Sequence, residues 1–175
     1  MHFSVKNLID LRENVNKKLK ELNINNYTPN IVAVSKTFPI EIIKPLLDYG
    51  HKDFGENKVQ EAIDKWTNVK IKYPNINLHM IGKLQTNKVK LAVKIFDFIH
   101  SVDSFKLAKK ISDEQNKISK KIKILLQINV GKEMQKSGID IENVSKLYDE
   151  CKEINLNVVG LMCIPPIGKP VEKYF

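Results

Sequence analysis

One stretch of the sequence decides the fold: Ile31-Val32-Ala33-Val34-Ser35-Lys36-Thr37-Phe38-Pro39. Its first four residues are apolar and three of them are β-branched, without the polar alternation of a strand that has one face in water. Such a run is typical of a parallel strand that is buried on both faces. Pro39 has the fixed φ that suits the first turn of a helix, so the stretch predicts a strand followed at once by a helix.

The same order of strand and helix recurs along the whole chain. A helix is expected over 3–22, with Ser4 as its N-cap, and it precedes the first strand. The expected strands cover 31–35, 51–54, 78–81, 98–100, 122–130 and 158–164, and the helices between and after them cover 39–49, 58–72, 86–95, 104–118 and the residues from 139 onward. Repeated strand–helix units predict parallel strands joined by right-handed crossovers. No linker or change of composition interrupts them, so we predict one domain over residues 1–175.

Two architectures fit this alternation, an open doubly wound sheet and a (β/α)8 barrel. Neither a Gly-x-Gly-x-x-Gly motif nor a P-loop follows the first strand, so the nucleotide-binding fingerprints are missing. Polar residues instead end several strands: Ser35-Lys36, Glu56-Asn57, Gly82-Lys83, 101–103 and 127–129. Functional groups from many strands on one face are typical of the barrel. We therefore predict an α/β fold, a TIM-type (β/α)8 barrel with about six βα units present.

The composition excludes several classes of protein. With 175 residues, 42% hydrophobic and 28% charged, the chain is too apolar for a disordered protein and long enough for a sizeable core. No apolar run reaches the ~18 residues of a membrane helix, and the N-terminus lacks the apolar stretch of a signal peptide. Two cysteines, Cys151 and Cys163, form no disulfide framework, so we expect a cytoplasmic protein without a membrane partner.

The net charge of +9 does not by itself indicate a nucleic-acid partner. Of the 29 basic residues only Arg12 is an arginine, and the lysines are spread along the whole chain. Base reading and tight phosphate binding favour the bidentate guanidinium of arginine. We therefore interpret most of the charge as a solvated lysine surface and expect no specific nucleic acid.

Lys36 is the first candidate for chemistry, because it ends the first buried strand. Its stem would lie inside the barrel and its amine at the barrel mouth, where partial desolvation lowers the pKa of an amine. A neutral amine can attack an aldehyde and form a Schiff base. The alternative is a lysine that extends into solvent like most of the others.

A series of motifs, the first of which contains Lys36, bears on the choice between a Schiff-base lysine and a solvent-exposed one. They are Ala33-Val34-Ser35-Lys36-Thr37, Phe54-Gly55-Glu56-Asn57-Lys58-Val59-Gln60-Glu61, 79–88, 100–104, 127–130, Lys136-Ser137-Gly138 and Gly160-Leu161-Met162. In order and spacing they resemble the YggS/PROSC family of pyridoxal 5′-phosphate (PLP) homeostasis proteins, over about residues 3–170.

The resemblance implies a single-domain barrel of PLP fold type III, similar to the N-terminal domain of alanine racemase. The family's cofactor-bearing lysine falls on Lys36. Family members bind PLP and take part in vitamin B6 homeostasis without an assigned catalytic reaction, so no catalytic residue is predicted. The resemblance implies PLP-dependent apoenzymes as recipients of the cofactor, and we expect a monomer or a weak dimer. The alternative is a PLP-dependent amino-acid racemase-like enzyme, which needs a second acid or base that the chain does not obviously supply.

Three further residues are predicted to bind the cofactor, each beside a structural alternative. Asn57 faces the cofactor in the family, or caps the following helix. Ser101 approaches the ring, or caps the helix after it. Met162 lies under the pyridine ring, or is packed in the core. His79 is interpreted as a hydrogen-bonded core histidine, and Lys136-Ser137-Gly138 as a turn into a helix, with an anion at the helix start as the alternative.

Two expected absences complete the prediction. His51, His79 and His100 lie on separate strands without the spacing of a metal motif, so no metal is expected. The family's last strands, which hold the phosphate, have no counterpart after Pro165-Pro166, and Arg12 lies too early in the chain to replace their arginine. We therefore expect residues 1–175 to be a C-terminally truncated barrel.

Overall fold

The computed structural model describes residues 1–133, 137–168 and 170–174. Its α-helices are α1 (Phe3–Glu21), α2 (Ile40–Asp48), α3 (Val59–Lys72), α4 (Val89–Ile95), α5 (Phe105–Lys117) and α6 (Val144–Glu153). Its strands are β1 (Ala33–Val34), β2 (Asp53–Glu56), β3 (Asn77–Met80), β4 (Phe98–Val102), β5 (Lys123–Ile128) and β6 (Asn157–Cys163). Short 3-10 turns η1 (Thr86–Lys88), η2 (Ile141–Asn143) and η3 (Val171–Lys173) complete the elements.

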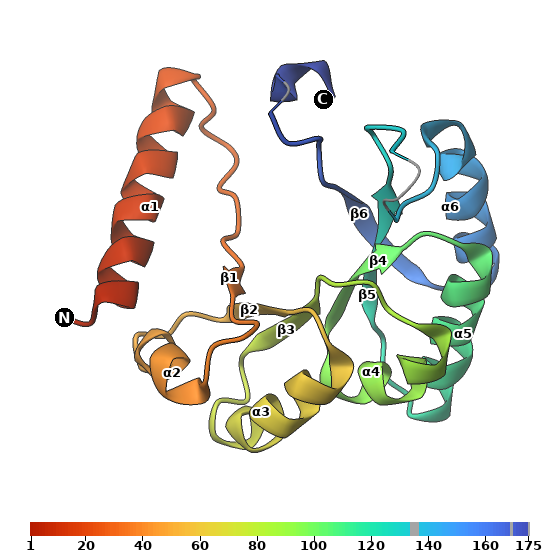
Figure 1. Ribbon diagram of the computed structural model, residues 1–175, viewed down its shortest axis with the longest axis horizontal. Helices are drawn as coiled ribbons and strands as arrows, with labels where there is room; N and C mark the ends of the chain where they lie inside the picture. The colour runs from red at the N-terminus through yellow and green to blue at the C-terminus, as the bar shows by residue number, and fades with distance from the viewer. Residues whose placement is uncertain (134–136, 169, 175) are drawn as a thin grey trace.

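The six described strands form one parallel sheet in the order of the chain, β1-β2-β3-β4-β5-β6. A doubly wound sheet reverses its strand order at a switch point, whereas a TIM-type barrel adds each strand beside the last. The sequential order therefore confirms the barrel type. Helices α2 to α6 lie along the outer side of the curved sheet, and α1 stands apart beside α2 (Figure 1).

The hydrophobic core lies between the sheet and this layer of helices. Phe54, Leu78 and Ile99 of neighbouring strands are fully buried and belong to one cluster with Trp66 of α3. These residues alternate along each strand with residues of the opposite face, as the pleat requires. The expected apolar strand runs therefore supply the outer, helix-covered face.

The inner face of the sheet carries a chain of polar side chains. His79 Nε2 donates to Asp53 Oδ1 at 3.1 Å, and His79 Nδ1 lies 2.9 Å from His100 Nε2. Because Nε2 of neutral His79 is the donor, its Nδ1 accepts from His100. The ring of His79 also stacks on Phe98, with centroids 4.3 Å apart. The interpretation of His79 as a hydrogen-bonded core histidine is confirmed.

We expect this histidine chain to make stability depend on pH. Burial lowers the pKa of His79, against the opposing pull of Asp53, and burial with repulsion from His79 lowers the pKa of His100 to about 4. The unfolded chain, with histidine pKa values near 6.5, takes up protons first, so stability falls as the pH drops from about 6.5 to about 4. Urea unfolding at pH 7.5 and pH 5 should differ by roughly 1–2 kcal/mol, after a discount for the partial exposure of His100.

The control for this pH effect is His100→Gln, which keeps a hydrogen-bond donor but cannot titrate. The variant should lose part of the difference in unfolding free energy between pH 7.5 and pH 5. A wild-type protein that is equally stable at both pH values would contradict the prediction.

Several element boundaries differ from those expected. The N-cap of α1 is His2, whose ring accepts a hydrogen bond from the backbone N–H of Ser4, so the prediction of Ser4 as the cap is wrong. Strand β1 has only two residues and pairs with β2 alone, and Val34 is 47% exposed. Strand β2 begins two residues later than expected and includes Glu56, so the turn after it starts at Asn57.

Candidate functional site

Lys36 lies two residues after the end of β1, beyond Ser35, at the carboxyl-terminal edge of the sheet. The turn that presents it is closed by a hydrogen bond from Phe38 N to Ser35 O of 3.2 Å, and Thr37 has a left-handed φ of 67°. The side chain of Lys36 is exposed, so the prediction that its stem is buried is wrong. The reason is that β1 is an edge strand with a single partner. An exposed primary amine remains able to form a Schiff base with an aldehyde.

A buried ion pair holds the residue that precedes Lys36. Glu56 is fully buried, and its Oε1 accepts hydrogen bonds from Ser35 Oγ at 2.8 Å and Trp66 Nε1 at 2.9 Å. Lys65 Nζ lies 2.9 Å from the same oxygen and also donates to Ser35 O at 2.8 Å. Oε2 of Glu56 has no hydrogen-bond partner among the described residues. Because β1 has few ladder bonds, this network does much to fix the strand end that carries Lys36.

A cavity of about 280 Å³, which we call the mouth cavity, opens at the same edge of the sheet. It brings together Asn57 after β2 and Met162 of β6, two of the predicted cofactor residues. Its remaining lining is Ile81, Gly82, Lys83, Gln127, Ile128, Asn129, Ser137 and Ile164. Amide and hydroxyl groups around an apolar floor are able to orient a polar, planar ligand. Lys36 and Ser101 lie outside this lining.

The structural alternatives for two residues are wrong. Asn57 does not cap the next helix, because Lys58 occupies the N-cap position of α3. Ser101 lies within β4, and Ser104 is the N-cap of α5. The hydroxyl of Ser101 is buried without a partner among the described residues, where β4 shifts its register. Neither side chain is therefore used as a helix cap.

Other predicted features are placed as follows. Met162 pairs with Gln127 across β5 and β6, and both line the mouth cavity, so Met162 is not a closed core position. Lys136 lies outside the described residues. Gly138 has a positive φ of 127°, and a Cβ at this position would collide with the backbone of Ile128 and Asn129. Cys151 is buried, which raises the pKa of its thiol to about 11, in keeping with a structural role.

Gly82 brings the loop before η1 against the end of β2. A Cβ at this position would lie 2.4 Å from Asn57 O and 2.8 Å from Asn57 Cα, both backbone atoms. Gly82→Ala should therefore displace the loop and destabilise the protein by about 1–3 kcal/mol in urea unfolding. Gly160→Ala is the matched control, because the nearest atom to its Cβ would be Leu125 Cδ2 at 3.9 Å. Equal effects of the two substitutions would contradict the steric argument.

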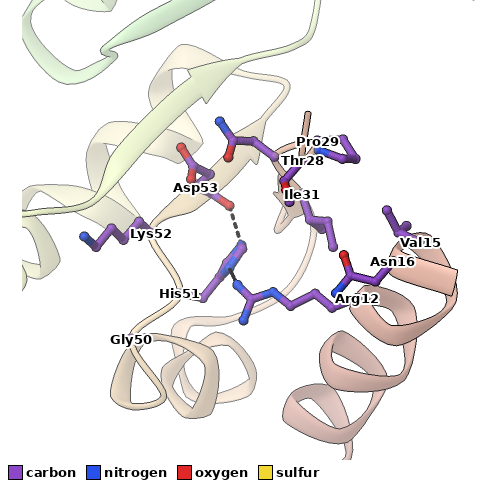
Figure 2. Close-up of a pocket in the computed structure, with 11 residues that line it drawn as sticks. Arg12, Val15, Asn16, Thr28, Pro29, Ile31, Gly50, His51, Lys52 and Asp53 are labelled. Atoms are coloured by element: carbon purple, nitrogen blue, oxygen red, sulfur yellow. Dashed lines mark hydrogen bonds between the residues drawn. The ribbon is translucent and has the colours of Figure 1, made fainter. Parts of the chain in front are cut away.

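Another cavity, of about 360 Å³, lies at the opposite, amino-terminal end of β1 and β2. Figure 2 shows Arg12 extending from α1 toward His51, whose Nδ1 lies 3.4 Å from the guanidinium Nη2. The other ring nitrogen of His51 donates to Asp53 O at 2.9 Å. Arg12 is thus held far from the strand ends that carry Lys36.

The described residues offer neither a metal-type cluster nor a membrane-spanning helix. None of their groups of histidine, cysteine, aspartate and glutamate has the arrangement of a metal site. None of their helices is long and apolar enough to cross a membrane.

Comparison with known proteins finds a matching family model and similar relatives. Residues 7–173 match the family model of the alanine racemase N-terminal domain. The chain is 40% identical, over 164 residues, to the pyridoxal phosphate homeostasis protein of Buchnera aphidicola (subsp. Schizaphis graminum), covering 91% of this chain and 71% of that relative.

Solved structures resemble it too. PipY of Synechococcus elongatus with PLP bound is 32% identical, with a TM-score of 0.74 over 91% of this chain and 74% of its own. An alanine racemase of Clostridium difficile is 17% identical, with a TM-score of 0.61 over 86% of this chain and 40% of its own, a likeness of fold alone.

Proposed function

The chain belongs to the pyridoxal phosphate homeostasis proteins, a family with the alanine racemase N-terminal fold, and from that premise we propose that it binds PLP reversibly as a Schiff base on Lys36. The observation that carries the proposal is the position of Lys36, which lies at the same carboxyl-terminal end of the strands as the mouth cavity. A solved relative, PipY, has PLP bound. Reversible imine formation suits a protein that stores and releases an aldehyde cofactor, because water or another amine reverses it.

The residues at this edge fit the cofactor. Asn57 and Met162 line the mouth cavity, and the hydroxyl of Ser101 is buried with no partner among the described residues. A buried hydroxyl without a partner is costly unless a ligand or water satisfies it. We propose that Asn57 and Ser101 hold polar groups of the cofactor and that Met162 packs against its ring.

A PLP-binding role without catalysis is better supported than a racemase activity. The relative quoted above is named for homeostasis, whereas the likeness to alanine racemase is one of fold. Racemisation requires a second acid or base on the other face of the substrate carbon. We propose that no such reaction takes place, and an assay for interconversion of D- and L-amino acids tests this directly.

The proposal also covers the compartment, the oligomeric state and the recipients of the cofactor. We propose that the protein works in the cytoplasm, as a monomer or a weak dimer, and passes PLP to apoenzymes that require it. No specific nucleic acid is needed for this role, since the lysines are dispersed and the chain has a single arginine.

The decisive experiment is an absorbance spectrum of the purified chain with added PLP, before and after borohydride reduction. A Schiff base should give a near-visible band, and reduction should remove the band and fix the cofactor on one peptide. Peptide mapping should locate it on Lys36. A label scattered over many lysines, or no band at all, would refute the proposal.

A further inference from the structure

A second cavity, of about 390 Å³, lies beside the mouth cavity and has a different chemical character. We call it the cationic cavity, and its lining is Asn57, Lys58, Val59, Gln60, Met80, Lys83, Gln85 and Lys88. It shares Asn57 and Lys83 with the mouth cavity, so these two residues form the wall between them. Its volume lies within the range of small-molecule sites.

The charge of this cavity is entirely positive. Three lysines line it, and no aspartate or glutamate does. Lys58 pairs with Glu61 at 2.7 Å, whereas Lys83 and Lys88 have no ion-pair partner among the described residues. Many lysines elsewhere are neutralised, such as Lys44 by Asp48. Two uncompensated ammonium groups on one concave surface favour a bound anion.

The loop that carries these lysines is anchored. Leu84, between them, is buried with only 4% of its surface exposed, and Gly82 lies against the backbone of Asn57. The 3-10 turn η1 is closed by a hydrogen bond from Lys88 N to Gln85 O of 3.0 Å. Met80 and Val59 are buried beneath. The floor of the cavity and the backbone of its loop are therefore preformed, whereas the side chains of Lys83 and Lys88 are exposed at its rim.

We propose that the cationic cavity binds a small phosphate monoester, with Lys83 and Lys88 as the charged ligands. Lysine binds phosphate as a mobile point charge, and the pocket has room for one compact ligand. Gln85 offers an amide donor beside the two ammonium groups, while the amide of Gln60 already donates to Asp64. The site does not depend on Schiff-base formation at Lys36, so it goes beyond the proposed function.

The test uses inorganic phosphate as its probe and the Lys36→Ala variant as its background. Removing Lys36 separates this site from the Schiff base, so failure here leaves the proposed function standing. Isothermal titration at constant ionic strength, set with chloride, should show phosphate binding. Lys83→Gln/Lys88→Gln should weaken it about 10- to 100-fold, as expected for losing two charge-assisted contacts.

The matched control is Lys90→Gln/Lys94→Gln on α4, which removes the same charge from exposed lysines outside the cavity. It should change phosphate affinity by less than about twofold. Glycerol phosphate, a monoester, should bind at least as well as inorganic phosphate. Equal weakening by both double variants, no heat above that of chloride, or malonate binding as tightly as phosphate would each overturn the proposal.

Discussion

Lys36→Ala is expected to abolish the near-visible absorbance that PLP gives with the wild-type chain. The imine requires a primary amine at this position, and no other side chain follows β1 on the turn from Ser35 to Phe38 with that chemistry. Lys36→Arg should behave the same way, because it keeps the charge but not the amine. Titration of each variant with PLP in a spectrophotometer, followed by borohydride trapping, measures the effect.

The control for Lys36 is a lysine at the other end of the sheet. Lys52 is exposed and lines the cavity of Figure 2 beside His51. Lys52→Ala should keep the full absorbance, since it changes the net charge equally without touching the carboxyl-terminal edge. Persistent absorbance in Lys36→Ala, with the label moved to another lysine, would show that the Schiff base is not specific.

The order of elements was predictable because helix and strand differ in their hydrophobic period. Helices α1 to α3 begin and end within about two residues of the expected bounds, and strands β3 to β6 lie at the predicted apolar runs, whereas β1 is shorter than expected and β2 is displaced. Polar residues at strand ends also predicted where side chains would converge. Asn57, Gln127 and Asn129 line the mouth cavity from β2 and β5. Parallel strands bring such ends to one edge without further information.

Long-range pairs were not predictable in the same way. Glu56 is predicted only as a polar strand-end residue, and nothing in the spacing of Lys65 along α3 indicates that Lys65 reaches back to Glu56 and Ser35. Likewise the link from His79 to His100 depends on the register of β3 and β4, which periodicity leaves open. The predicted burial of the Lys36 stem rests on the apolar run before it alone. Its actual exposure depends on how many strands flank β1. Each of these facts depends on tertiary neighbours.

Lys65→Met is expected to destabilise the protein by about 3–5 kcal/mol. The substitution leaves the carboxylate of Glu56, which is fully buried, with only the neutral donors Ser35 and Trp66. An uncompensated buried charge is costly in a low-dielectric interior, and Lys65 itself is only 14% exposed. Urea unfolding at pH 7.5 measures the loss. The control is Lys109→Met on α5, which breaks the exposed ion pair of Lys109 with Asp113 and should cost less than about 1 kcal/mol.

The double variant Glu56→Gln/Lys65→Met separates stability from positioning. Gln at this place keeps an oxygen for Ser35 and Trp66 and buries no charge, so most of the lost stability should return, with a coupling of roughly 1–3 kcal/mol. Ser35 O still lacks the ammonium donor in this variant, so the turn that presents Lys36 stays looser. Hydrogen exchange at Phe38 N, which donates to Ser35 O, should therefore remain faster than in the wild type while β4 and β5 stay protected. If the effects of the two substitutions on stability simply added, the ion pair would not be the unit that holds this strand end.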